Sequence, residues 1–522
     1  MLHYHLVIVA FWLFSQVNCE IFTALTDLRE LVNTEAVFVQ TLENYIRVEE
    51  LRIGRLKRYI YSHHYEKAAK DVESYVGNPV NAYILIKQLI IDWEEVESII
   101  QSNAGKDYMK NLVAAKMNMK YPTEEDLNGA AVGIFRLQDT YNLDTASLAR
   151  GELRGVKYSS ELTAAECFEL GRQGYNNDDF YHTILWMQEA SNRLSKEQNK
   201  TAKRSDIFDY LAFSIYKEGN ISLALELTNK LLEMIPKHER ALKNKEYYEK
   251  QLQEFKENQG SGIEVQVENE LSYMTKRHQS LCRGDLKLLD EVIARLKCRY
   301  VTNNNPYLLI GPFKAEDLHI DPDLVLFHNV VSDQEIEKIK KLAIPKLQRA
   351  QVVEPATGQL KTVQNRISKS AWFEDIEHEY VAAISQRVED MTGLSVSTSD
   401  PLQVANYGIG GHYLPHYDFA QKGDAPFPKG DRIATVLFYM SDVEQGGATV
   451  FPITGASVYP KKGTAVFWYN LFPSGDGDSR TKHAACPVLV GSKWIFTKWI
   501  YDRGQVFLRP CTLERPPDDL TI

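Results

Sequence analysis

Apolar residues near the start of the chain recur at the spacing of a helix. Three- and four-residue steps, interrupted at Glu35 and Glu49, connect Leu28, Leu31, Phe38, Leu42 and Tyr45. This period predicts amphipathic helices from residue 20 to about residue 145. The apolar stripe suits either a helix of a second chain or a bundle within one chain, and the pattern alone favours neither.

A pair of helices is predicted twice between residues 160 and 250. Tyr175 and Tyr216 occupy matching positions about 41 residues apart, somewhat more than the tetratricopeptide period of ~34. Stacked helix pairs form a concave groove. The aromatic residues expected to line this groove are Tyr210, Phe213, Tyr216 and Tyr247. Such a groove suits an extended proline-rich peptide, and packing between the repeats is an equally open alternative.

From about Pro306 the pattern changes to short runs of β-branched and aromatic residues broken by Gly and Pro. These runs predict strands of a sandwich or a jelly roll. The glycine-rich stretch Asn258–Gly262 marks a linker. We therefore expect a helical, coiled-coil-like domain at residues 20–150 and a tetratricopeptide-like domain at residues 160–255. A linker at 256–305 and a β domain at 306–522, with its core at about 400–502, would follow.

Charge and the N-terminal sequence narrow the class of protein. The 522 residues carry a formal net charge of -10, so nucleic acid, which needs a basic face, is not an expected partner. Leu6–Phe14 is an apolar run typical of a signal-peptide core and too short to cross a membrane. We predict a signal peptide at residues 1–19, with a buried N-terminal helix as the alternative. No later apolar run approaches ~20 residues, so no membrane span is expected.

Secretion would place the remaining cysteines in an oxidising compartment. Closeness in sequence predicts the disulfide pairs Cys282–Cys298 and Cys486–Cys511 and leaves Cys167 over, although sequence cannot fix the connectivity. Two glycosylation sequons, beginning at Asn199 and Asn220, fit the same compartment.

The candidate chemistry lies at His416-Tyr417-Asp418. On a strand, residues two apart point to the same side, so this triplet would present an imidazole and a carboxylate on one face. With a second histidine from a distant strand, they would form the facial triad that holds non-haem iron(II). His483 is the only histidine downstream and is therefore the expected third ligand.

A second triplet of the same spacing, His319-Ile320-Asp321, competes for this role, with His378 further along the chain. Ten residues after His483 comes Lys493, a cation that can pair with the distal carboxylate of 2-oxoglutarate, whereas no cation stands ten residues after His378. We therefore interpret the His319 triplet as a decoy. His412 lies in a glycine-rich turn and is interpreted as a pocket-rim residue.

Strand alternation extends this pocket. If Lys493 faces inward, so do the residues at even offsets, which places Lys493, Trp499 and Tyr501 along one wall. The alternative is that the residues of this strand only pack in the core and line no pocket.

Several long motifs surround these residues, namely Leu402–Gly408, Pro415–Ala420, Arg432–Val443, Gly446–Pro452, Gly463–Leu471 and His483–Gly491, with Leu137–Thr145 and Cys167–Gly171 upstream. They resemble the α subunit of collagen prolyl 4-hydroxylase, an iron- and 2-oxoglutarate-dependent dioxygenase. The resemblance implies a multidomain chain in which all-α N-terminal and tetratricopeptide-like domains precede a C-terminal double-stranded β-helix (jelly roll). The implied activity is procollagen-proline 4-dioxygenase: X-Pro-Gly proline, 2-oxoglutarate and O2 give 4-hydroxyproline, succinate and CO2.

The resemblance also assigns residues and partners. It implies Fe(2+) at His416, Asp418 and His483, 2-oxoglutarate at Lys493 and Tyr407, and L-ascorbate as the reductant that rescues oxidised iron. A proline-rich, collagen-like peptide would bind at Tyr210, Tyr216 and Tyr247, where Phe213 replaces a tyrosine of the family. The N-terminal helices at 20–150 resemble the family's dimerisation segment. The implied partner is protein disulfide isomerase, in an α2β2 tetramer in the endoplasmic reticulum lumen.

One residue departs from the family pattern. The family usually has a histidine at Tyr501, close to Trp499, and that histidine helps to position the oxo acid. A phenol is neutral and longer, so we expect altered 2-oxoglutarate affinity and coupling with the same reaction type. Two alternatives stay open: a non-catalytic collagen-peptide-binding subunit, and a prolyl hydroxylase of another proline-rich secreted protein.

Overall fold

The computed structural model describes residues 20–62, 69–102, 104–258, 273–353, 359–424, 427, 429–514 and 517. The predicted signal peptide and most of the linker sequence that begins at Asn258 lie outside the described residues. Contacts divide the chain into two compact units, of which one contains Asp27–Thr123 and the other Glu20–Thr26 with Glu124–Ile522. Across the described residues, no helix combines the length and the apolar character needed to cross a membrane.

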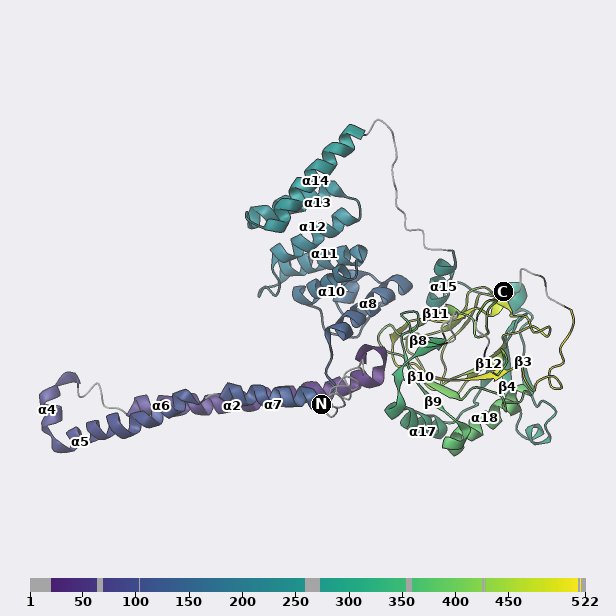
Figure 1. The fold of residues 1–522 in the computed structure, drawn as a ribbon, viewed down its shortest axis with the longest axis horizontal. Coiled ribbons are helices and arrows are strands. Elements are labelled where there is room, and N and C mark those ends of the chain that lie inside the picture. Colours follow the sequence, from purple (N-terminus) through teal and green to yellow (C-terminus); the bar gives the residue numbers. More distant parts are fainter. Residues whose placement is uncertain are drawn as a thin grey trace, which may run out of the picture. The chain divides into compact units, whose positions relative to one another are not determined.

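The first unit is a long helical hairpin. Helix α2 (Leu25–Ser62) runs alongside the returning helices, of which the described ones are α4 (Val72–Gly77), α5 (Pro79–Lys87), α6 (Trp93–Gln101) and α7 (Ala104–Asn118) (Figure 1). Aromatic pairs join the two arms, with ring centroids 5.7 Å apart for Phe38 and Tyr121 and 5.1 Å apart for Tyr45 and Tyr108. Leu42, from the same predicted stripe, is 45% exposed. Part of the stripe, including Phe38 and Tyr45, therefore packs against the other arm of the hairpin. Another part, including Leu42, is exposed on the surface.

The second unit begins with stacked helices. Helix α8 (Glu124–Tyr141) precedes the short α9 (Thr145–Ala149) and five longer helices: α10 (Ala164–Asn176), α11 (Phe180–Lys196), α12 (Arg204–Lys217), α13 (Ile221–Met234) and α14 (Glu239–Asn258). A Thr163–Glu166 capping box starts α10, and Asn220 caps α13 through its side chain. One core that includes Trp186, Leu211 and Tyr248 runs through the stack, which confirms the tetratricopeptide-like fold class.

The C-terminal part is a jelly roll. Its nine-stranded sheet has the order β3-β4-β5-β16-β12-β19-β10-β9-β6, and its four-stranded sheet has the order β11-β17-β14-β15. The strands of the large sheet are β3 (Cys298–Val301), β4 (Phe313–Ile320), β5 (Asp323–His328), β6 (Gln348–Arg349), β9 (Lys369–Phe373), β10 (Leu402–Asn406), β12 (Arg432–Tyr439), β16 (Ala465–Tyr469) and β19 (Trp494–Tyr501). Those of the small sheet are β11 (Tyr413–His416), β14 (Thr449–Phe451), β15 (Ala456–Val458) and β17 (His483–Ala485).

Each face of the large sheet has its own core. One face packs on α17 (Asp333–Ala343) and α18 (Glu379–Thr392), with Ile384 and Phe496 in the contact (Figure 1). The other face packs on the small sheet through Trp468 and Ile495. Phe496 and Ile495 are consecutive on β19, so the strand alternates between the two cores. This alternation decides which residues of β19 can reach a site between the sheets.

A short N-terminal segment belongs to this second unit. Residues Glu20–Thr26 lie beside α8 and the turn that precedes β11. The carbonyl of Phe22 accepts a hydrogen bond from the Ile409 amide at 3.1 Å. A Cβ atom at Gly408 would lie 2.0 Å from that same carbonyl oxygen, so glycine is required for the segment to approach so closely.

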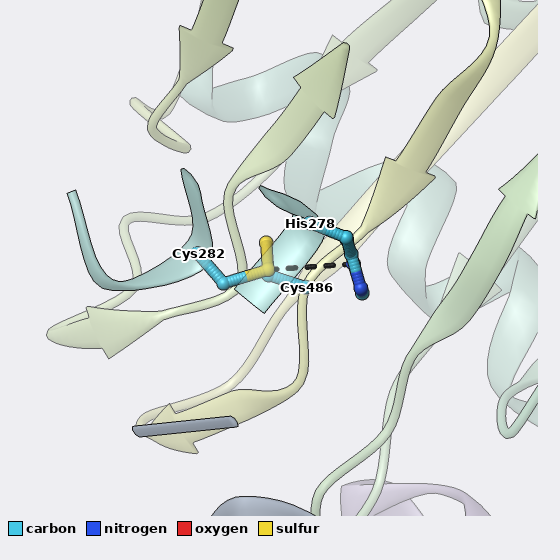
Figure 2. A group of neighbouring side chains, drawn as sticks. All are labelled: His278, Cys282 and Cys486. Carbon is cyan, nitrogen blue, oxygen red and sulfur yellow. Dashed lines mark hydrogen bonds between the residues drawn. A yellow bond between two sulfur atoms is a disulfide. The ribbon is translucent and has the colours of Figure 1, made fainter. Parts of the chain in front are cut away.

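The disulfide connectivity differs from the prediction. Cys282, on α15 (Tyr273–Arg283), is bonded to Cys486, 204 residues further along the chain (Figure 2). The predicted pairs Cys282–Cys298 and Cys486–Cys511 are therefore wrong. Cys282 and Cys486 lie in one buried cluster, whereas Cys298 and Cys511 are exposed free thiols and Cys167 is a buried one.

Candidate functional site

Two paired strands bring the candidate metal ligands together. His416 ends β11 and lies directly opposite His483, the first residue of β17, with ring centroids 4.3 Å apart. Asp418 follows two residues later, beyond the end of the strand. The expectation that strand alternation aligns His416 with Asp418 is therefore wrong, because a bend turns the carboxylate inward. Its Oδ1 lies 3.6 Å from Nε2 of His416, and its Oδ2 lies 3.6 Å from Nε2 of His483.

Backbone carbonyls fix both imidazoles in the form that can bind a metal ion. Nδ1 of His416 donates to the Leu414 carbonyl at 2.8 Å, and Nδ1 of His483 donates to the Thr481 carbonyl at 3.1 Å. These bonds leave Nε2 of each ring with its lone pair. Burial, aided by the neighbouring His483, lowers the pKa of His416 to about 3, so its imidazole is neutral.

Asp418 is held as a carboxylate. Burial would raise its pKa, but electrostatic interactions with the nearby His483, His416 and Arg432 side chains and a hydrogen bond from Thr435 outweigh that effect and lower the pKa. A chain of hydrogen bonds supports it: Thr435 Oγ1 donates to Asp418 at 2.7 Å, and Asn470 donates to Thr435 at 2.9 Å. The Trp468 indole completes the chain by donating to Asn470 at 2.8 Å. Because these partners come from β12, β16 and the residue after β16, the spacing of the ligands gave no signal for them.

The donor set fits iron(II). Two imidazole nitrogens and one carboxylate, all within 4.8 Å of one another, form the facial arrangement typical of non-haem iron and leave the opposite side open. His319 and His378 join no such group among the described residues. His412 is 3% exposed and lines neither cavity at the site, so its interpretation as a pocket-rim residue is wrong.

A buried lysine faces the inner pocket beside this triad. Lys493 is fully buried, and its Nζ has no hydrogen-bond partner among the described residues. It lies 5.1 Å from the centre of the Tyr407 ring, and burial lowers its pKa to about 7. A cation without a partner is costly unless an anion joins it. The pocket, which both Tyr407 and Lys493 line, therefore fits the carboxylate of a 2-oxo acid.

Strand β19 connects this inner pocket to an outer cavity. Lys493, Thr497 and Trp499 line the inner pocket, and Trp499 and Tyr501 line a cavity of about 880 Å³ that also includes His416 and Asp418. Of the predicted wall, Lys493 and Trp499 share the inner pocket, whereas Tyr501 lines the outer cavity and not the inner pocket. Arg366, buried at 6% exposure, lines both spaces, and no motif pointed to it.

Tyr501 faces away from the inner pocket. Its hydroxyl donates to Asp400 at 3.0 Å, and Asp400 also accepts hydrogen bonds from Arg432 at 2.7 and 3.0 Å. Burial raises the pKa of Tyr501 to about 12, so the phenol stays neutral. The guanidinium of Arg432 lies 4.3 Å from the centre of the Trp499 ring. These contacts place Tyr501 at the outer cavity, and its effect on 2-oxoglutarate affinity and coupling stays a prediction.

The predicted groove residues form a partly exposed aromatic strip. Tyr210, Phe213 and Tyr216 lie on α12 and Tyr247 on α14, where Tyr247 is 47% exposed. Neighbouring rings are in contact, with centroids 6.2 Å apart for Phe213–Tyr216 and 5.7 Å apart for Tyr216–Tyr247. Arg240 lies over this strip, 5.3 Å from the Phe213 ring. The Tyr210, Phe213 and Tyr216 side chains are half-buried and Tyr247 is exposed, so the strip is partly accessible, and its role in binding a peptide stays a prediction.

The two sequons are accessible. Asn199 and Asn220 are both exposed, and Oδ1 of Asn220 accepts a hydrogen bond from the Leu223 amide at 3.1 Å. Their glycosylation stays a prediction.

Comparison with known sequences connects these features. The chain matches the prolyl 4-hydroxylase alpha-subunit N-terminal region at residues 24–155, the prolyl 4-hydroxylase peptide-substrate-binding domain at residues 164–254, and the 2OG-Fe(II) oxygenase superfamily at residues 402–501. It is 45% identical to prolyl 4-hydroxylase subunit alpha-1 of Gallus gallus, over 95% of this chain and 99% of that one. The alpha-1 subunit of Homo sapiens is 45% identical, covering 94% and 95%. The alpha-2 subunit of Caenorhabditis elegans is 43% identical, covering 95% and 94%.

Proposed function

This chain belongs to the prolyl 4-hydroxylase alpha-subunit family, and from that premise we propose that it hydroxylates proline in X-Pro-Gly repeats of procollagen-like chains. One peptidyl proline, one 2-oxoglutarate and one O2 give 4-hydroxyproline, succinate and CO2. The observation that carries the proposal is the meeting of His416, Asp418 and His483 beside Lys493, a buried cation for which the described part of the chain offers no hydrogen-bond partner.

Each part of the site has a task in this reaction. When bound, iron(II) supplies the oxidising chemistry that couples decarboxylation of 2-oxoglutarate to hydroxylation at proline C4. His416, Asp418 and His483 would hold the ion, and Lys493 and Tyr407 would bind the distal carboxylate of the oxo acid. Thr435 keeps the Asp418 carboxylate oriented. Trp499, Arg432 and Tyr501 line the cavity through which the proline ring would approach.

Substrate capture is the task of the aromatic strip. Tyr210, Phe213, Tyr216 and Tyr247 would pack against a proline-rich peptide in the polyproline II form, whose stiffness lowers the entropy lost on binding. Tethering one part of a long repetitive chain there raises its effective concentration at the catalytic domain.

We place this activity in the endoplasmic reticulum lumen, in an α2β2 tetramer with protein disulfide isomerase, with L-ascorbate as reductant. Family membership, the Cys282–Cys486 disulfide and the exposed sequons support this location. Co-purification of the two proteins from a secretory compartment tests the assembly. A chain that is active and monomeric there would remove the partner from the proposal.

The activity itself is tested with His416→Ala. Its release of succinate in response to a (Pro-Pro-Gly)-type peptide should fall to background, together with its iron content. The His319→Ala variant is the matched control, because His319 belongs to the competing triplet, and it should keep both. Full turnover by His416→Ala would refute the assignment.

The same assay decides between the alternatives. A non-catalytic collagen-peptide-binding subunit would bind the peptide without releasing succinate, although such a protein need not keep three ligands and a buried lysine. A hydroxylase of another proline-rich secreted protein would prefer a different peptide, and Phe213 is the change that suggests it. Identical peptide-array profiles for the wild type and Phe213→Tyr would remove that alternative.

A further inference from the structure

A second cluster of metal-ligating side chains lies apart from the iron site. His278 and Cys282 are four residues apart on α15, so they share one face of the helix. Cys486 directly follows strand β17 and points at the same face (Figure 2). The donor atoms of the three residues lie within 4.8 Å of one another. All three are buried, at 6%, 2% and 0% exposure.

The imidazole of His278 is poorly satisfied as an ordinary core histidine. The hydrogen bond found for its ring goes to Sγ of Cys282 at 3.4 Å, and sulfur is a weak partner. Burial lowers the pKa of His278 to about 4, so the ring is neutral and keeps a lone pair. A neutral imidazole is the form in which histidine binds metal ions.

We infer that the dithiol form of this cluster binds one thiophilic ion of the zinc class, and that this ion and the disulfide are alternative occupants. Two thiolates and one imidazole are a donor set found in zinc proteins, where a fourth position stays exchangeable. This second site is independent of the proposed hydroxylation.

The two states are related by a balanced exchange. A dithiol reductant donates two electrons and two protons, its own thiols become a disulfide, and the Cys282–Cys486 bond becomes two thiols. Ion binding then releases both thiol protons and forms two sulfur–metal bonds and one nitrogen–metal bond. A newly made chain passes through the dithiol form before the disulfide closes, so the ion has a period in which it can bind.

Either occupant joins the same two elements. The Cys486 amide donates to the Ala448 carbonyl at 2.8 Å, which holds it beside β14, and His483 begins the strand that ends just before it. A cross-link through Cys486 therefore ties α15 to the strand that carries a predicted iron ligand. The ion would keep this connection while the disulfide is open.

Cobalt(II) is the probe that tests the site, because only thiolate ligands give it an intense near-ultraviolet charge-transfer band. The full-length chain, with any co-purified partner, is reduced with a phosphine, freed of reductant without air and titrated with Co2+. The matching titrations use Cys486→Ser, His278→Gln and, as the control, Cys298→Ser, which removes an exposed thiol. Co2+ at the His416 site adds no such band, since that site contains no sulfur.

We expect the reduced wild type and Cys298→Ser to bind one equivalent of thiolate-bound Co2+ more than reduced Cys486→Ser, a difference to which the thiols of a co-purified partner do not contribute. The oxidised wild type should bind none. His278→Gln, which leaves both thiols in place, should raise the Kd for this equivalent by at least about tenfold. The inference is overturned if the reduced wild type and Cys486→Ser bind equal amounts of thiolate-bound Co2+, or if the Kd is unchanged in His278→Gln.

Discussion

Replacement of Lys493 by methionine should stabilise the fold while it removes the anchor for the oxo acid. Lys493 is fully buried and has no hydrogen-bond partner among the described residues, so its ammonium has lost hydration without gaining an ion pair. Methionine has a similar volume and carries no charge. Replacing a buried charge by an apolar side chain of similar size is often stabilising.

The magnitude follows from the pKa of this lysine. Burial lowers it from 10.5 to about 7, which corresponds to at most about 5 kcal/mol against the charged form. Between pH 7 and pH 10.5 the unfolded chain still holds the proton that the folded chain has released, so this group makes stability rise with pH. Lys493→Met lacks that dependence. Its gain in the free energy of unfolding, without oxo acid, should be about 5 kcal/mol at pH 6 and about 2 kcal/mol at pH 9.

Denaturant unfolding at both pH values, with and without 2-oxoglutarate, measures the effect. Saturating 2-oxoglutarate should stabilise the wild type and leave Lys493→Met unchanged, because only a bound ligand shifts unfolding. Lys498→Met is the control: Lys498 is buried on β19 and pairs with Asp375 at 3.3 Å. Burial lowers the pKa of Lys498 and Asp375 partly offsets that effect, so its loss should bring a smaller gain than Lys493→Met and no change in oxo-acid binding. A gain for Lys493→Met that is equal at pH 6 and pH 9 would refute the argument from charge.

Three further predictions concern the supports of the site and of the helical stack. Thr435→Val removes the hydroxyl that donates to Asp418 and should weaken iron binding by about 10–100-fold, measured by iron titration; unchanged affinity would contradict this role. Asp400→Asn weakens the hydrogen bonds that hold Arg432 and Tyr501. It should raise the KM for peptide by about tenfold, the equivalent of a lost charged hydrogen bond, and change the KM for 2-oxoglutarate less. A larger change in the KM for 2-oxoglutarate than in that for peptide would place Tyr501 at the oxo acid. Burial would lower the pKa of His182, but Asp139 and Asp179 outweigh it and raise the pKa to about 9, so its stabilisation is complete below pH 6.5 and is lost as the pH rises through about 9. His182→Gln should flatten stability over that range in thermal unfolding, and an unaltered slope would exclude His182 as the cause.

Features that depend on the spacing of residues within one helix or one strand could be predicted from the sequence. Strand alternation correctly placed Lys493 and Trp499 at the inner pocket because a strand has a period of two, which the β10–β19 pairing keeps over Trp494–Thr497. A bulge in β12 interrupts its pairing with β19 near Tyr501, which lines the outer cavity and not the inner pocket. The aromatic strip followed from three-residue steps on one helix in the same way. For the His416 triplet the residues meet as expected, but for a different reason, since the strand ends before Asp418.

Features that depend on distant partners could not be predicted. Cys282 and Cys486 are 204 residues apart, and nothing in their flanking residues indicates that α15 packs against the end of β17. Tyr501 lines the outer cavity and not the predicted pocket wall, because its orientation depends on Asp400, a residue 101 positions earlier in the chain. Thr435 on β12 and Asn470 just after β16 look like ordinary buried polar residues, and only the folded sheet reveals that they support Asp418.

The packing of Glu20–Thr26 has a consequence for biosynthesis. This segment leaves the ribosome long before its binding partner, since the Phe22 carbonyl is bonded to the Ile409 amide, 387 positions later. Chains are made from the N-terminus, so the segment first meets α8, where the Ile21 amide donates to Asp126, while the rest of the chain is still being synthesised. Closing the more distant contact with Ile409 is slow, and Ile21 and Phe22, both buried in the finished molecule, stay only partly covered in that interval. Completion of the catalytic domain thus closes the second half of the binding site for the oldest part of the chain.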